Sequence, residues 1–191
     1  MRFASAVAAG ICLALILGIG SAWLAVRSPA PVDAITIGPW QAWPNAGTDA
    51  VDPYSHARLA RTGEIPLGSG EGLALFAQND NRGETLNPYC DYRIVGLTPP
   101  ARLWTLAIEG EDGRALATRD DPHALGSDAV LRASDGSFAI SVGRKAAPGN
   151  WLSSENVGRF RLVMRLYDTT ARSVSGIDRL VMPRIELTRC A

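Results

Sequence analysis

The side chains best suited to binding a ligand share one face of a short expected helix. The segment 52–62, DPYSHARLART, begins with an Asp-Pro pair that favours a helix N-terminus, and a glycine follows it. Tyr54, Arg58 and Arg61 stand at i, i+4 and i+7, so they project from one side. Two guanidinium groups and a phenol could hold a carboxylate or a phosphate. The structural alternative is that the arginines bond carboxylates or loop carbonyls of the domain itself.

A second polar cluster lies in the segment RDDPHALGSD. Asp120, Asp121 and His123 could form a hydrolytic or cation-binding site, because neighbouring carboxylates can separate their pKa values. Clusters of Asp and Pro are also ordinary loop chemistry, so a solvated connection explains the same residues.

Several classes of function find no support in the residue pattern. There is no G-x-S-x-G nucleophile elbow, and Gly68, Gly70 and Gly72 precede an expected strand rather than join a strand to a helix. His56 and His123 lie far apart and lack metal-ligand spacing. The formal net charge of zero argues against nucleic-acid binding by bulk electrostatics. No cofactor and no metal are therefore expected, and an enzyme is the less favoured class.

The elements that would position these residues are mainly strands. Alternating or short apolar runs predict strands over residues 73–78, 90–96, 102–109, 137–143, 159–168 and 180–188. In the segment RFRLVMRLYD, Phe160, Leu162, Met164 and Leu166 should face one side and the arginines the other. An irregular arm with two tryptophans is expected before the short helix. The fold class is mostly β, an antiparallel β-sandwich or jelly roll with one short helix.

The N-terminal segment predicts a transmembrane helix ahead of this domain. Residues 3–26 contain no charged side chain, and 24 residues make a helix of about 36 Å, enough to cross a bilayer with some tilt. The expected organisation is an anchor over 1–27, a linker over 28–37 and a domain over 38–191. A cleaved signal peptide is the alternative, although its apolar region is usually shorter.

The expected location is the bacterial inner membrane, crossed once. Arg2 precedes the span and few basic residues follow it, which favours a cytoplasmic N-terminus and a periplasmic domain. Cys12 lies inside the span, so Cys90 and Cys190 remain as one pair in the domain. An oxidising compartment would allow these two to form a disulfide, and two buried free thiols are the alternative.

Two further motifs, PGNWL (148–152) and RLYDT (165–169), complete a resemblance to a known family. With DPYSHARLARTGEIPLG, the long central segment through LWTLAIEGEDG, and MPRIELTRC, they resemble the bacterial family called domain of unknown function 1214, over roughly residues 38 to 190. This would be a membrane-anchored, single-domain form. The resemblance implies a jelly-roll-like β fold and brings no agreed catalytic residue. Trp151 should fold back over the sheet, and Asp168 could pair with Arg58 or Arg61.

The leading functional hypothesis is a non-catalytic envelope module that binds a partner protein or a glycan. One alternative is a hydrolase that uses either polar cluster. Another is a structural subunit that oligomerises through its membrane helix, where Gly10, Gly18 and Gly20 could permit close contact.

Overall fold

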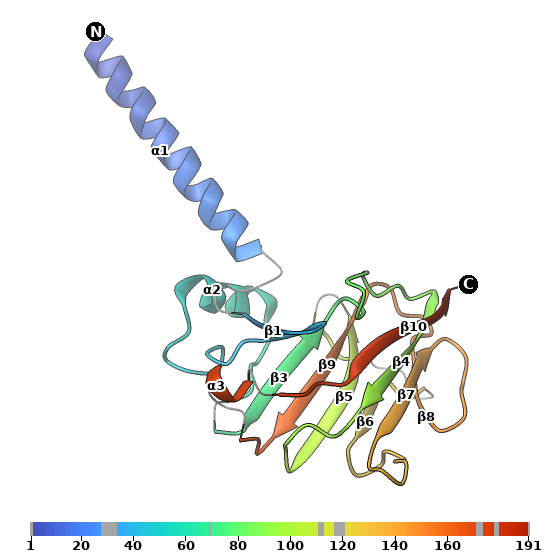
Figure 1. Cartoon of the computed structure of the whole chain (residues 1–191). Helices are drawn as coiled ribbons and strands as arrows, with labels where there is room; N and C mark the ends of the chain where they lie inside the picture. The colour runs from blue at the N-terminus through green and yellow to red at the C-terminus, as the bar shows by residue number, and fades with distance from the viewer. Residues whose placement is uncertain are drawn as a thin grey trace.

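The computed structural model of the chain describes residues 2–27, 34–68, 70–110, 113–116, 121–170, 174–177 and 180–190. A long helix, α1 (Arg2–Arg27), stands away from a β-rich domain built of two sheets (Figure 1). The fold class expected from the sequence is confirmed. None of the most apolar window of α1 is buried, and by length and composition the helix could cross a membrane.

The larger sheet has six strands in the order β1-β2-β3-β9-β5-β6. Their bounds are β1 (Ile35–Ile37), β2 (Trp40–Ala42), β3 (Gly72–Ala77), β9 (Phe160–Tyr167), β5 (Leu103–Gly110) and β6 (Ala124–Gly126). The smaller sheet has the order β10-β4-β7-β8, with β10 (Arg184–Cys190), β4 (Cys90–Gly96), β7 (Phe138–Gly143) and β8 (Asn150–Ser153). Two short helices accompany the sheets in the described part of the domain, α2 (Pro53–Thr62) and α3 (Val174–Ile177).

The structure corrects three details of the sequence-based expectation. First, β7 and β8 pair in parallel, with Ile140 opposite Asn150, whereas the expected sandwich was wholly antiparallel. An alternating pattern is the same in both chain directions, so it does not reveal strand direction. Second, α3 adds a helical turn to the one expected helix. Third, the expected irregular arm begins as the hairpin β1–β2, which starts three residues before the expected domain boundary.

The hydrophobic core between the two sheets contains the alternate apolar side chains of β9. Phe160, Leu162, Met164 and Leu166 all lie in this core, as the sequence predicted. Trp40 of β2 is completely buried with them, and its indole Nε1 donates to the carbonyl oxygen of Pro183 at 2.7 Å. Burial of the apolar faces of both sheets supplies the main driving force for this arrangement.

The opposite face of β9 carries buried charge. Arg161 is 4% exposed and donates to Oε2 of Glu109 on the neighbouring β5 from Nε (3.2 Å) and Nη2 (2.8 Å). The other carboxylate oxygen of Glu109 accepts from Arg165 at 2.5 Å. Arg161 also donates to Glu64, which follows α2, at 3.1 Å. This network joins the outer face of the larger sheet to the segment that carries α2.

A stack of aromatic rings and guanidinium groups covers the same face. The guanidinium of Arg161 lies 4.5 Å from the ring of Phe76, and Phe76 stacks on Trp43 with ring centroids 4.4 Å apart. The guanidinium of Arg58, in α2, lies 5.1 Å from the centroid of the Trp43 ring. The expected arm therefore packs on the outside of the larger sheet through Trp43 and reaches the inside through Trp40.

We predict that Glu109→Gln lowers the free energy of unfolding by about 3–5 kcal/mol, because it removes the buried carboxylate that Arg161 and Arg165 share. Urea unfolding followed by circular dichroism measures this loss. Glu155→Gln, at an exposed position, serves as the control and should change stability by about 0.5 kcal/mol or less. Equal midpoints for the two variants would contradict the role assigned to the network.

Candidate functional site

The short helix expected from the sequence is present, but its polar face is divided between two environments. The Asp52 carboxylate caps α2 by accepting from the backbone N–H groups of Tyr54 and Ser55. Tyr54 is 46% exposed, and Arg61 is also exposed. Arg58 is half-buried against Trp43, so the three side chains do not share one open surface.

The surroundings of Arg58 explain its electrostatics. Burial lowers the pKa of the Arg58 guanidinium from its ordinary value, and the neighbouring cations Arg161 and Arg61 lower it further. The negative charge of Glu64 raises the pKa of Arg58. These neighbours place Arg58 at the border of the buried ionic network, where its guanidinium stacks on an aromatic ring.

A cavity beneath α2 is too small for a substantial ligand. Its volume is about 40 Å³, and Trp43, Glu64, Phe76 and Arg165 contribute to its walls. A water molecule needs roughly 10–15 Å³ of such volume, so the cavity holds a few waters at most.

Asp168 directly follows β9, the strand whose Arg165 lines this cavity. It follows the last residue of the strand in a left-handed conformation (φ 49°), and its backbone N–H donates to the backbone carbonyl oxygen of Glu71 at 3.0 Å. The pairing of Asp168 with Arg58 or Arg61 stays a prediction.

The second polar cluster is only partly described. Asp120 lies outside the described residues, and Asp121 is half-buried. His123 is buried, and its ring Nδ1 donates to the carbonyl oxygen of Ser153 at 2.8 Å, tying the chain before β6 to the end of β8. Among the described residues, no three His, Cys, Asp or Glu side chains form a group that could hold a metal ion.

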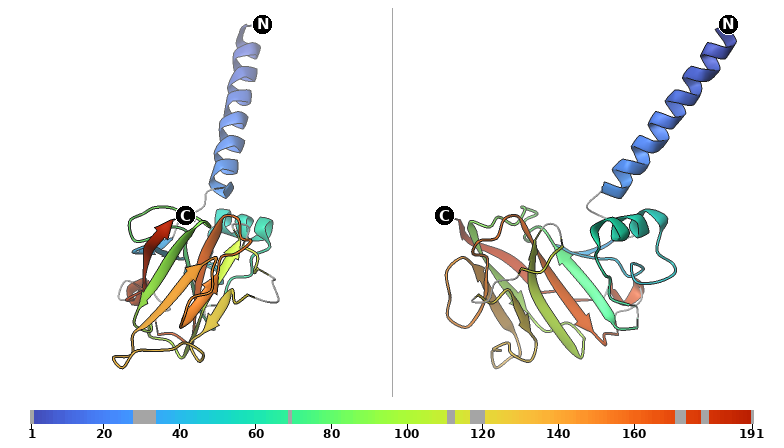
Figure 2. Two further views of the ribbon diagram at one scale, coloured as in Figure 1. Left: turned by 90° about the vertical axis from the view of Figure 1, so that its right-hand side faces the viewer. Right: turned by 180° about the vertical axis from the view of Figure 1, so that it is seen from behind.

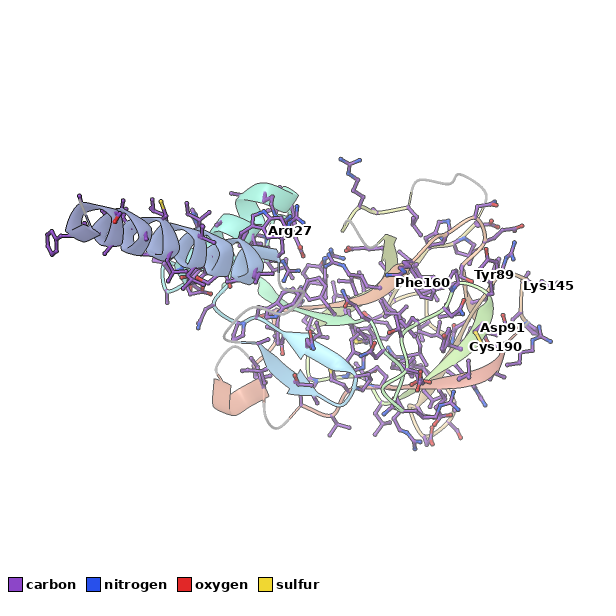
Figure 3. The ribbon with its side chains drawn as sticks, turned by 90° about the horizontal axis from the view of Figure 1, so that it is seen from above. Arg27, Tyr89, Asp91, Lys145, Phe160 and Cys190 are labelled. Carbon is purple, nitrogen blue, oxygen red and sulfur yellow. A yellow bond between two sulfur atoms is a disulfide. The ribbon has the colours of Figure 1, made fainter. Side chains whose placement is uncertain are left out.

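Two larger hollows lie at the other end of the domain, beside a disulfide. Cys90 and Cys190 face each other across β4 and β10 and are joined, as the cysteine count predicted. Figure 3 shows Tyr89, Asp91, Lys145 and Cys190 together at the end of the domain away from Arg27. They come from segments that lie far apart in the sequence.

Two adjoining hollows at this end form what we call the distal groove. They have volumes of about 550 and 280 Å³ and share Asp91, Lys145 and Arg189 as lining residues. Tyr89 lines the larger hollow, and Trp151 lines the smaller one. Volumes of this size are typical of sites for small molecules or segments of longer ligands.

The floor of the distal groove depends on a close approach at Gly143. Oδ2 of Asp91 accepts from Nε of Arg189 at 2.5 Å. A Cβ atom on Gly143 would lie 2.5 Å from the other oxygen of Asp91, which is shorter than a van der Waals contact. Only glycine therefore allows the carboxylate to sit between β7 and β10 in this position.

Both aromatic and cationic side chains line the distal groove. The Trp151 indole is half-buried and donates to the carbonyl oxygen of Gly143 at 3.1 Å, as expected for a ring folded over the sheet. The Tyr89 ring is 63% exposed, with the Arg144 guanidinium 5.5 Å away. Exposed Lys145 completes the wall and is the only lysine in the chain.

Sequence reasoning named Trp151 and the two cysteines but missed the remaining groove residues. Tyr89, Asp91, Arg189 and Lys145 belong to no motif, because the disulfide and strand pairing bring them together from three segments. The one available signal was compositional, since a single lysine stands against eighteen arginines.

These features define a β-sandwich module with an apolar N-terminal helix and an open polar groove. The family described as Protein of unknown function (DUF1214) matches residues 71–171, and the chain belongs to this family. No curated protein matches the chain.

Solved structures add a likeness in fold. The chain is similar to the crystal structure of the VPA0106 protein from Vibrio parahaemolyticus, with a TM-score of 0.57 and 23% identity over 73% of this chain. It is also similar to a putative uncharacterized protein from Burkholderia cenocepacia, with a TM-score of 0.43 and 18% identity over 92% of this chain. The chain spans only 36% and 51% of these two proteins.

We predict that replacing Cys90 and Cys190 together by serine destabilises the domain and loosens the distal groove. The chain-entropy model gives up to about 4.7 kcal/mol for a loop of this length, and measured values are often smaller. Urea unfolding gives the loss, and Cys12→Ser, in α1, is the matched control. A double variant as stable as this control would show that the bridge contributes little.

Proposed function

We propose that this protein is a membrane-anchored, non-catalytic binding module that holds a carboxylate-bearing glycan in the distal groove. In this proposal residues 1–27 cross the bacterial inner membrane, a short linker follows, and the domain from β1 onward lies in the periplasm. The distal groove is the observation that carries the proposal, because it joins cations and aromatic rings in a site of sufficient volume.

The composition of the groove favours a glycan over a protein partner. Cores of protein–protein interfaces are depleted in charged residues, whereas the two hollows are lined by five charged side chains. These are Asp91, Arg144, Lys145, Glu155 and Arg189. An exposed flat ring such as that of Tyr89 can pack on the apolar face of a sugar, and free cationic groups can bind its carboxylates.

The anchor and the compartment are supported by separate features. Residues 3–27 form a helix with a mean hydropathy of 2.3 over its most apolar window. The disulfide suits an oxidising compartment such as the periplasm. Together they favour an extracytoplasmic domain on a single span.

A non-catalytic role is supported by the positions of the candidate catalytic groups. The His123 ring is buried and bonded to a backbone carbonyl, so it does not face an open site. The Arg61 side chain donates to the carbonyl oxygen of Val26 at the end of α1. Figure 3 shows that Arg27, at this same end of α1, lies away from the distal groove residues Tyr89, Asp91 and Lys145.

Binding can be measured on the full chain in detergent micelles by calorimetric titration with hexagalacturonate. We expect Lys145→Ala to weaken binding about tenfold, since a hydrogen bond to a charged group contributes roughly 1.5–3 kcal/mol. Arg184→Ala removes the same charge from a side chain that does not line the groove, and it should bind like the unchanged protein. Equal binding by both variants, or tighter binding of an acidic peptide of equal charge, would reject the glycan assignment.

Counting thiols tests the anchor. A denatured, unreduced membrane fraction should carry one maleimide-reactive thiol per chain, that of Cys12, because Cys90 and Cys190 are bonded to each other. Reduction should raise the count to three. A count of zero before reduction would mean that the first segment has been removed, as a signal peptide is, and a count of three would mean that the bridge is open.

A further inference from the structure

The end of α1 meets α2 at a cluster of cations. Arg27 ends α1, and its guanidinium lies 3.7 Å from the centroid of the Trp23 ring. Arg61 of α2 donates from Nη2 to the carbonyl oxygen of Val26 at 3.3 Å. Figure 2 shows from two sides that α2 lies beside the last turn of α1. Two exposed guanidinium groups therefore stand where the apolar helix ends.

The position of α1 in a bilayer determines how deep this cluster of cations lies relative to the lipid. If lipid covers the exposed apolar side chains of α1, Trp23 and Arg27 lie at the boundary with water, where tryptophan and cationic side chains are favoured. Because Arg61 contacts Val26, α2 must lie in the same layer as the lipid headgroups. The contact fixes its depth to within the length of one side chain.

The composition of α2 suits that layer. Its ten residues include two arginines, one histidine and no acidic side chain. Asp52 caps the far end of the helix, about 14 Å along its axis from Arg61. Tyr54 is exposed, and tyrosine is enriched at membrane–water interfaces.

We propose that Arg27, Arg61 and Tyr54 form a surface that docks α2 on the phosphates of an anionic phospholipid bilayer. A phosphate accepts hydrogen bonds from the planar guanidinium of Arg61 while that side chain also donates to the Val26 carbonyl of α1. This inference rests on the proposed membrane span, and it is independent of the ligand in the distal groove.

Hydrogen exchange of the full chain in lipid nanodiscs tests the docking. One set of discs contains phosphatidylcholine alone, and the other contains phosphatidylcholine with phosphatidylglycerol. We expect the amides of α2 to exchange more slowly in the anionic discs, by about fivefold for each arginine near the surface. The double variant Arg27→Gln/Arg61→Gln should lose this protection.

Arg93→Gln/Arg184→Gln is the matched control, because both side chains are exposed on the smaller sheet and carry the same charge. It should keep the protection of the unchanged protein, and circular dichroism should show both double variants to be folded. Equal exchange of α2 in the two kinds of disc overturns the proposal. Protection that survives in Arg27→Gln/Arg61→Gln, or that inorganic phosphate produces in the neutral discs, overturns it as well.

Size-exclusion chromatography separates this outcome from failure of the anchor. A chain that does not enter the discs contradicts both the membrane span and the docking. A chain that enters the discs without lipid-dependent protection contradicts the docking alone.

Discussion

The buried pair of Arg161 and Glu109 is the constraint on which the arrangement of the domain depends. Two charges on the outer face of a sheet cannot be covered by apolar side chains alone, because each buried charge needs hydrogen-bonding partners. The covering segment therefore brings its own carboxylate, Glu64, to Arg161, and the Phe76 ring of the neighbouring strand β3 packs on the same guanidinium. In doing so the covering segment fixes α2 on the sheet and aims Arg61 at the end of α1.

The sequence predicted much of the fold because local periodicity and capping signals are readable. The strands β4, β5, β7 and β9 and the capped helix α2 were found within one or two residues. The direction of strand β8 and the pairing of β1 with β2 were not predicted from the sequence, because both depend on tertiary contacts. The candidate site was harder still: alternation placed Arg161 on the side away from the core, but no local pattern identifies Glu109 as its partner.

The family match and the structural units have different boundaries. Residues 71–171 run from the start of β3 to just beyond β9 and include Glu109 and Arg161. Glu64, which bonds to Arg161, precedes the matched region, and Cys190, which lines the distal groove, follows it. The matched region thus supplies the charged face and most of the groove, and flanking segments complete both sites.

The single lysine has a practical consequence. Apart from the α-amino group, Lys145 carries the only primary amine in the sequence, and it stands on the wall of the groove. Succinimidyl ester reagents would thus attach a fluorophore or a photoreactive group almost selectively at this place, with no engineered handle. An endoproteinase that cleaves after lysine would meet one bond in the whole polypeptide, so shielding of that bond would report occupancy directly.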